Sequence, residues 1–319
     1  MNENKGIERE PNSIIVFEHN YIDKSRKIVK LEDVIIRNIG EKLYWIDVWG
    51  KENLEALESL GIDKKAIESL TENIEFNVKM YPDDMFRFDL GHLCFEDWIQ
   101  NWDFTVQNMH CLLGGRFLIS YHERDSELSS ELINHYVSDQ SVTSKHAVFL
   151  IFEMFHHMID SLLRVHNTMQ NKLVLLDKSV VTRNDDLMIE ASKMQNDFLI
   201  MREIDHYARN VLNHLSNRSS LFVSQNTLPA VDNMSMVLER LEDDLVADRE
   251  ICSNILNIYM TIVNFRMNLI IKKITSLNLI FSGVALLAAI YIALPKQTLS
   301  AVFFVIIMVI CGLWISKKF

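Results

Sequence analysis

Two uncharged apolar segments near the C-terminal end are the most marked pattern in the sequence. Residues 274–294 and 298–316 contain no Asp, Glu, Lys or Arg. At about 1.5 Å per residue, each segment as a helix is long enough to cross a hydrocarbon layer of about 30 Å. The pattern predicts a first transmembrane helix (274–294), an outer loop (295–297) and a second transmembrane helix (298–316). A pair of buried helices in a water-soluble protein is the alternative, and the lysines that flank both segments argue against it.

A helical pattern runs without a break into the first of these segments. No proline lies between Pro229 and Pro295, and Gly283 is the one glycine between them. A single helix of about 65 residues, roughly 100 Å long, is therefore expected, with residues 229–273 as a stalk. Asp248 interrupts a coiled-coil-like series of apolar residues on this helix. That series is Val231, Met234, Leu238, Leu241, Leu245, Cys252, Ile255, Tyr259 and Ile262.

A second series on the same helix is small or neutral and polar. Its members recur at intervals of three or four and so share one face of the helix. They are Asn257, Thr261, Asn264, Asn268, Ile271, Thr275, Asn278, Ser282, Ala285 and Ala289. Asn and Ser inside a bilayer need a polar partner or water. The series fits two structures equally well: the lining of a water-filled pore, or a surface for close helix–helix packing.

The rest of the chain divides into a helical part and a mixed part. Residues 146–181 and 185–217 have helical apolar periods and predict an antiparallel helical hairpin. Before about residue 140, short β-branched and aromatic runs alternate with helical stretches at 52–70 and 125–137, which predicts a small α/β domain. The fold class is an α+β membrane protein. Its expected segments are an α/β domain (1–140), a hairpin (141–228), the stalk, the two spans and their loop, and a tail (317–319).

The distribution of charge predicts how the chain is oriented. Lys272 and Lys273 precede the first span, and Lys317 and Lys318 follow the second, while Lys296 is the one charged residue of the outer loop. Both termini are therefore expected in the cytoplasm, with the protein in the inner cell membrane as a multi-pass protein. The formal net charge is −11, with the acidic surplus upstream of the spans. This argues against nucleic acid as the main partner and favours divalent cations or basic proteins.

Candidate chemistry outside the spans is sparse. Glu242, Asp244 and Asp248 belong to an acidic cluster on the stalk, for which a solvated helix face is the simplest explanation. The histidines show no HExxH or HxxxH spacing and are not predicted as zinc ligands. The cysteines, including Cys311, have no metal-ligand or disulfide spacing and are expected to be buried and reduced. No catalytic signature is present, so an enzyme is not expected, nor is a tightly bound cofactor.

Three stretches together resemble a known family, the CorA-type metal-ion transporters. They are "WIDVWGKENLEALESLGID", "LLGGRFLISYHERDSELSSEL" and "IYMTIVNFRMNLIIKKITSLNLIF". The resemblance implies a funnel-shaped homopentamer in contact with membrane lipid, with the first span lining the pore. It implies that Mg²⁺, Co²⁺, Zn²⁺ or a similar cation is transported or acts as a regulator. It also makes Glu242, Asp244 and Asp248 of the stalk candidate ligands of a regulatory metal ion.

The same resemblance assigns expected roles to residues of the pore. Asn268 matches the asparagine of the inner mouth, Ile271 and Ile274 match a hydrophobic constriction, and Asn278 and Ser282 match polar rings. The family's Gly-Met-Asn motif at the outer mouth is absent, because Ile292, Ala293 and Leu294 stand there. These residues offer no side-chain acceptor to the hydration shell of a cation.

Three functions remain open from the sequence. The first is a divalent metal-cation channel or transporter, which can include nickel among its ions. The second is a ligand-gated membrane effector in defence or signalling, or a non-selective pore of the same architecture. The third is a non-conducting scaffold with a degenerate pore.

Overall fold

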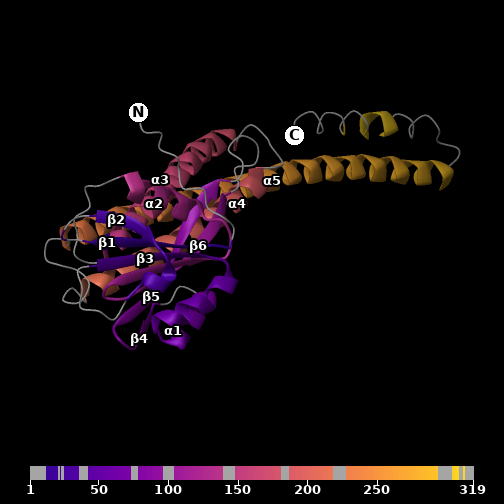
Figure 1. Ribbon diagram of the computed structural model, residues 1–319. Coiled ribbons are helices and arrows are strands. Elements are labelled where there is room, and N and C mark those ends of the chain that lie inside the picture. The colour runs from indigo at the N-terminus through magenta and orange to yellow at the C-terminus, as the bar shows by residue number, and fades with distance from the viewer. Residues whose placement is uncertain are drawn as a thin grey trace, which may run out of the picture. The chain divides into compact units, whose positions relative to one another are not determined.

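A seven-stranded mixed sheet lies at the centre of the N-terminal part of the chain in the computed structural model (Figure 1). The strand order is β2-β1-β3-β7-β6-β5-β4. Only β3 and β7 pair in parallel; the other neighbours are antiparallel. The strands are β1 (Ile14–Asn20), β2 (Ser25–Val29), β3 (Lys42–Trp49), β4 (Lys79–Tyr81), β5 (Met85–Phe95), β6 (Phe104–Leu113) and β7 (Phe117–His122).

The structure describes most of the chain, with gaps. The described residues are 12–20, 22, 25–35, 42–72, 78–95, 104–138, 148–180, 187–217, 228–293, 304–308 and 312. The chain divides into two units. One comprises Met1–Leu175 and Lys193–Ile251, and the other comprises Leu176–Ser192 and Cys252–Phe319.

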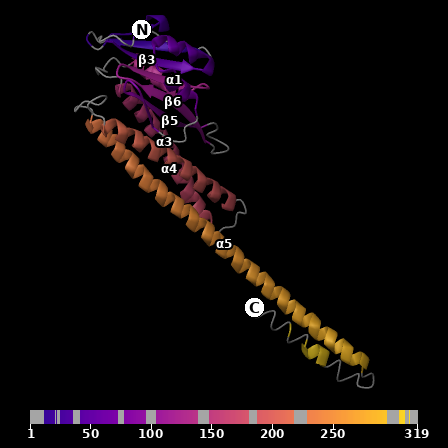
Figure 2. The same cartoon turned by 90° about the horizontal axis from the view of Figure 1, so that it is seen from below.

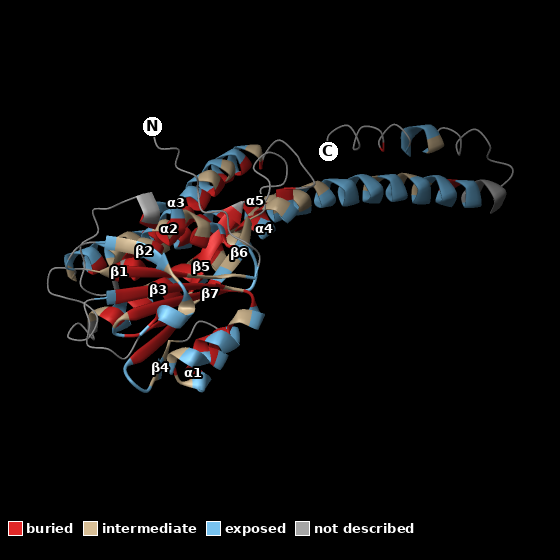
Figure 3. Cartoon of the chain, in the orientation of Figure 1, coloured by how far each residue is buried: buried red, intermediate tan, exposed pale blue. Residues whose placement is uncertain are grey.

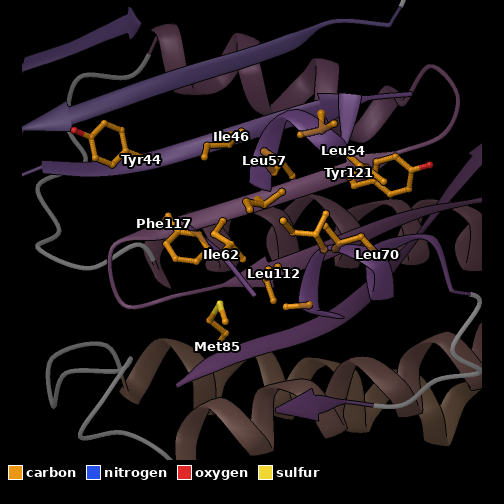
Figure 4. Close-up of a cluster of buried hydrophobic side chains, with 14 of the residues drawn as sticks. Tyr44, Ile46, Leu54, Leu57, Ile62, Leu70, Met85, Leu112, Phe117 and Tyr121 are labelled. Carbon is orange, nitrogen blue, oxygen red and sulfur yellow. The ribbon is translucent and has the colours of Figure 1, made fainter. Parts of the chain in front are cut away.

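One face of the sheet buries an apolar cluster beneath short helices (Figure 4). Ile46 of β3, Ile119 of β7 and Leu112 of β6 pack there with Leu57 and Leu70 from the segment between β3 and β4. This segment was expected to be helical, and it forms helix α1 (Lys64–Glu68) flanked by 3₁₀ turns. The segment is broken because Gly61 has a left-handed conformation (φ 75°) and Asp63 caps the next turn by accepting a hydrogen bond from the Lys65 amide.

Helices α2 (Glu127–Ser138), α3 (Val148–Ser179) and α4 (Leu187–Asn217) supply the contacts of the opposite face. The amide of Asp89 on β5 donates to the Tyr207 hydroxyl of α4. Gly91 of β5 lets Ile204 of α4 approach closely, since a Cβ at Gly91 would stand 3.3 Å from the Ile204 side chain. On α2, Tyr136 packs edge-on against Trp45 of β3. The sheet is therefore a middle layer, and its strands β3, β5 and β7 are almost entirely buried (Figure 3).

Helix α5 (Leu228–Ala293) is a single helix of 66 residues, as the spacing of the prolines predicted (Figure 2). The expected apolar seam is confirmed in its first half, where Val231, Leu238, Leu241, Leu245 and Ile255 are all buried. Within the first unit, α5 lies beside α4. The predicted α/β domain and the long helix are thus both present.

Strand β2 is a strand of this part that the sequence analysis did not predict. Its five residues, SRKIV, have no apolar–polar alternation, and most of them are exposed. The strand is held by its ladder to β1, in which Glu18 forms an ion pair with Lys27; Glu18 also pairs with Lys42 at the start of β3. It is an edge strand, whose pairing depends on backbone hydrogen bonds more than on a buried face. The division into seven domains and segments stays a prediction, and residues 295–297 and 317–319 lie outside the described residues.

Candidate functional site

The neutral polar series predicted from the sequence lies along the second half of α5. Asn264, Asn268, Thr275, Asn278 and Ser282 are all exposed in the single chain. So are the other predicted lining residues, Ile271, Ile274, Ala285 and Ala289. We call the face defined by Asn264, Asn268, Ile271, Thr275, Asn278, Ser282, Ala285 and Ala289 the polar face of α5. Ile274 stands at its edge, next to Thr275.

Two threonines of this helix direct their hydroxyl groups in a defined way. Thr275 Oγ1 donates to the carbonyl oxygen of Ile271 at 2.8 Å, and Thr261 Oγ1 donates to the carbonyl oxygen of Asn257 at 2.8 Å. Each hydroxyl hydrogen is thereby used within the helix. The oxygen of each hydroxyl keeps acceptor capacity for another group.

A different face of the same helix is covered by the chain itself. A Cβ at Gly283 would lie 3.2 Å from Met308, and a Cβ at Gly312 would lie 2.7 Å from Ile280. The residues covered in this way are Ser276, Ile280 and Gly283, which are partly buried, and Leu287, which is buried. They are three or four positions apart and therefore form one stripe along the helix. This covered stripe is turned away from Asn278 and Ser282. Packing through small residues within the chain therefore uses the covered stripe and leaves the polar face open.

Among the described residues, one helix is long and apolar enough, by length and composition, to cross a membrane. It covers Leu228–Ala289, and its most apolar stretch is exposed in the single chain. Of the predicted second span, residues 304–308 and 312 are described and helical. Ile292 and Ala293 belong to α5, whereas Leu294 and the predicted outer loop lie outside the described residues.

Asp248, the exception in the apolar seam, has a buried partner. Its Oδ2 lies 2.8 Å from Nε2 of His166 on α3, and both side chains are almost completely buried. An unpaired carboxylate at this seam position would be strongly destabilising. The sequence showed that Asp248 was unusual, but its partner stands 82 positions away and has no local signal.

A second polar cluster joins α4 to α5. Glu242 accepts hydrogen bonds from Arg202, at 3.3 Å, and from Arg209. Arg209 also lies 3.3 Å from the fully buried Asp205. Burial raises the pKa of Asp205 to about 7, even though Arg209 acts in the opposite direction. The sequence analysis missed Asp205, whose signal is a carboxylate among the apolar residues Met201, Ile204 and Ala208.

The three predicted ligands of a regulatory metal ion are not gathered at one point. Asp248 faces α3, Glu242 is paired with arginines of α4, and Asp244 is exposed. Neither of the two groups of closely spaced potential ligands among the described residues contains any of them. A metal ion at this place stays a prediction, and it would have to displace these partners.

The motif "WID" near residue 45 has a structural role. Asp47 is buried and accepts hydrogen bonds from Ser120 at 2.6 Å and from Ser129 at 2.8 Å, and it lies 3.2 Å from Nε2 of His122. Trp45 donates to the same Ser120 hydroxyl. This network ties β3 and β7 to α2. Cys94, Cys111 and Cys252 are buried, as predicted, and none of these three is in a disulfide; Cys311 lies outside the described residues.

Comparison with solved structures supports the same fold over nearly the whole chain. The CorA magnesium transporter from Methanocaldococcus jannaschii has a TM-score of 0.77 at 16% identity, with 96% of this chain and 97% of that chain covered. The full-length CmaX protein has a TM-score of 0.75 at 13% identity, covering 98% and 99%. The ZntB cytoplasmic domain from Vibrio parahaemolyticus RIMD 2210633 has a TM-score of 0.64 at 10% identity, covering 79% and 98%.

Sequence comparison agrees with the structural one. YfjQ of Bacillus subtilis (strain 168), a protein named for metal ion transport, is 18% identical over 252 residues, which are 78% of this chain and 77% of YfjQ. A model of one family, described as CorA-like Mg²⁺ transporter protein, matches residues 40–317. The resemblance seen in three sequence stretches is thus confirmed, and the chain belongs to the CorA-like family of metal-ion transporters.

Proposed function

We propose that this protein is a homo-oligomeric channel for divalent metal cations, in which α5 from each copy lines a central pore. The cations are Mg²⁺, Co²⁺, Zn²⁺ or ions of similar charge and size. The resemblance of the sequence to the CorA type supports five copies. Lipid surrounds the second apolar segment in this proposal.

The open polar face of α5 is the observation that carries the proposal. In a single chain it is exposed beside the strongly apolar residues Leu277, Leu279 and Phe281. Amide and hydroxyl groups cannot face hydrocarbon without a partner. The chain covers the stripe of Ile280 and Gly283 and leaves Asn278 and Ser282 uncovered. Several copies around a water-filled axis would satisfy all of these groups together.

The family favours transport over the other functions considered. CorA-like proteins are transporters and not enzymes, in agreement with the lack of a catalytic signature in the sequence. YfjQ and the Methanocaldococcus protein are both named for metal-ion transport. These relatives give no support to a signal-gated effector.

Each group of the polar face has a proposed part in conduction. Asn264 and Asn268 form the inner mouth and offer amide oxygens to the water shell of the ion. Ile271 and Ile274 form a narrow hydrophobic ring that closes the pore by excluding water. Asn278 and Ser282 form polar rings beyond it, and Ala285 and Ala289 keep the outer part wide. None of these residues is charged, so a hydrated cation binds weakly and can leave again.

The outer mouth differs from that of the family, and this limits selectivity in the proposal. Ile292, Ala293 and Leu294 stand where the sequence resemblance places Gly-Met-Asn. Mg²⁺ keeps its inner water shell and is recognised through acceptors directed at those waters. We therefore propose that the channel discriminates poorly among hydrated divalent cations.

The membrane arrangement is part of the same proposal. Residues 274–294 and 298–316 span the inner membrane, and both termini are cytoplasmic, because paired lysines flank the inner ends. A tightly bound cofactor has no part in it; Mg²⁺ or another divalent cation is the substrate.

Ion flux into liposomes that contain the full-length protein tests the proposal. We expect uptake of Mg²⁺ and Co²⁺, reported by an enclosed fluorescent chelator, to exceed that of protein-free vesicles. The variant Asn268→Leu removes the amide from the inner mouth, and we expect flux to fall about tenfold or more.

Leu277→Ala is the matched control, because Leu277 is also exposed on α5 but lies off the polar face. Its flux should equal that of the unmodified protein. Wild-type vesicles that take up no divalent cation would refute conduction. Equal flux in Asn268→Leu would refute the assignment of the pore face.

A further inference from the structure

Helices α2 and α3 each carry a glutamate followed four residues later by a histidine. On α2 these are Glu131 and His135, and on α3 they are Glu153 and His157. Residues four apart stand above one another on a single helix face. Both pairs lie within the first unit of the chain, outside α5 and its polar face.

The two pairs face each other in a crossed arrangement. Nδ1 of His157 lies 3.4 Å from Oε2 of Glu131, and Nδ1 of His135 lies 3.7 Å from Oε2 of Glu153. The two imidazole rings are 5.8 Å apart between centroids. One ligand atom each from His135, Glu153 and His157 lies within 4.8 Å of the other two. Three side chains from two helices therefore converge on one small volume, and Glu131 adjoins it beside His157.

The spacing fits a shared cation better than direct hydrogen bonds. An N–H···O bond usually measures about 2.7–3.2 Å between heavy atoms, and both distances are longer. Ligand atoms around a tetrahedral Zn²⁺, each about 2.0–2.2 Å from the metal, stand about 3.3–3.6 Å apart. The two nitrogen–oxygen distances are close to that range.

The surroundings hold the four groups in place and leave them accessible. Leu132 and Ile133 on α2, and Met154 and Met158 on α3, are buried and anchor the two helices. The four side chains themselves are between 22% and 45% exposed. A cation can therefore reach them from solvent without unfolding either helix.

The chemistry of the four groups selects the class of cation. Two imidazole nitrogens with two carboxylates are typical ligands of Zn²⁺, Co²⁺ and Ni²⁺. Mg²⁺ prefers oxygen ligands in an octahedron and retains its water. We propose that Glu131, His135, Glu153 and His157 form a binding site for a divalent first-row transition metal that joins α2 to α3. This goes beyond the proposed function, since binding here does not require conduction.

A neighbouring group, His92, Cys94 and Glu127, is less suited to a cation. His92 and Cys94 are buried on β5, and burial lowers the pKa of His92 to about 4. Arg164 lies near enough to act on His92 in the same direction, and its positive charge would also oppose a bound cation.

The histidines were not predicted as ligands because the search was for motifs within one helix. A pattern of Glu-x-x-x-His on one helix is common by chance. The same pattern recurs 22 residues later on the second helix, and this can be read from the sequence. The crossing of the two helices cannot be read from it.

Titration of tag-free, detergent-purified full-length protein with Co²⁺ tests the site. Four-coordinate Co²⁺ with histidine ligands gives visible absorption bands, and Zn²⁺ should abolish them by displacement. We expect one tight equivalent of Co²⁺ per chain, unaffected by a large excess of Mg²⁺. His157→Gln and His135→Gln should each weaken Co²⁺ binding about tenfold or more.

His156→Gln is the matched control. His156 is the sequence neighbour of His157, is more exposed, and faces Asp160 on its own helix at 3.7 Å. Its Co²⁺ affinity should be unchanged. Circular dichroism of each metal-free variant verifies that α2 and α3 remain folded, and Glu153→Gln provides a second ligand variant if one histidine variant misfolds.

Three results would overturn the site. They are the absence of a band that Zn²⁺ displaces, equal Co²⁺ affinity in His157→Gln and His156→Gln, and displacement of Co²⁺ by Mg²⁺ at comparable concentration. Failure of the ion-flux experiment leaves these measurements unaffected, so the two proposals can fail separately.

Discussion

The two halves of α5 have the same backbone conformation but different surroundings. Between Val231 and Ile255 the helix has a buried seam that its own chain covers. Beyond Asn264 nearly every side chain is exposed, including Phe265, Leu279 and Phe281. The first half obtains its stability from packing that the chain supplies, as most protein helices do. The second half leaves so much apolar surface exposed that lipid or other copies have to cover it.

The largest expected difference lies between a phenylalanine that the chain buries on α3 and an exposed phenylalanine in the second half of α5. Phe155 on α3 is 0% exposed, and Phe281 on α5 is 68% exposed. We expect Phe155→Ala to lower the free energy of unfolding by about 3–5 kcal/mol, because it leaves a cavity. Phe281→Ala should change it by less than about 0.5 kcal/mol. Chemical denaturation in detergent, followed by circular dichroism, measures both changes in unfolding free energy. Equal changes in the two variants would contradict the different burial of the two phenylalanines.

Removal of one partner of the buried Asp248–His166 pair should have the next largest effect. We expect Asp248→Ala and His166→Ala each to cost about 2 kcal/mol of unfolding free energy, since each leaves a buried polar group without its partner. The double variant should be much less destabilised than the sum of the two. Additive losses in a double-mutant cycle would show that the pair is not coupled.

The buried Asp205 makes the stability of the first unit depend on pH. Its pKa is raised to about 7 from 3.8. Between these values the folded chain binds the proton and the unfolded chain does not, so this residue makes the unfolding free energy fall as pH rises through this range. Between pH 5 and pH 8, we expect the unfolding free energy of Asp205→Asn to fall by about 1–2 kcal/mol less than that of the unmodified protein.

Glu239 on α5 is exposed and provides the control for this pH experiment. The variant Glu239→Gln should keep the pH dependence of the unmodified protein. Thermal or chemical unfolding at several pH values compares the variants, and a slope unchanged in Asp205→Asn would show that another group is responsible.

Cysteine pairs in the second half of α5 should change the stability least. They test most directly which side chains of this region face each other. Cysteines in Ile280→Cys/Gly312→Cys should form a disulfide within one chain, because a Cβ at Gly312 would stand 3.8 Å from Cβ of Ile280, a usual separation for bridged cysteines. Cysteines in Ser282→Cys/Gly312→Cys should not, since Ser282 faces away from the covered stripe. Ser282→Cys alone should instead crosslink neighbouring copies if the polar face lines an axis. Denaturing gel electrophoresis under oxidising conditions separates these products.

Elements that follow from local patterns could be predicted from the sequence. The strands around Phe17, Ile46 and Ile119 have alternating or continuous apolar residues, and α5 contains no proline after Pro229 and one glycine, Gly283. Strand β2 could not be predicted, because an edge strand of polar residues is defined by its neighbour β1. The breaks around Gly61 and Asp63 depend on turn geometry within a stretch that has a helical period.

The candidate site divides in the same way. The polar face of α5 could be predicted, because all its residues lie on one helix. Three other contacts each join two helices: Asp248 with His166, Glu242 with Arg209, and His135 with His157. Such contacts depend on how the helices cross, which periodicity does not encode.

The hydroxyl hydrogens of Thr261 and Thr275 are already bound to carbonyl oxygens of their own helix. Each threonine therefore turns only the negative end of its dipole outward. An anion entering a passage bordered by such groups would meet lone pairs and no donor from either residue. Discrimination by the sign of an ion could thus arise in a passage that contains no formal charge.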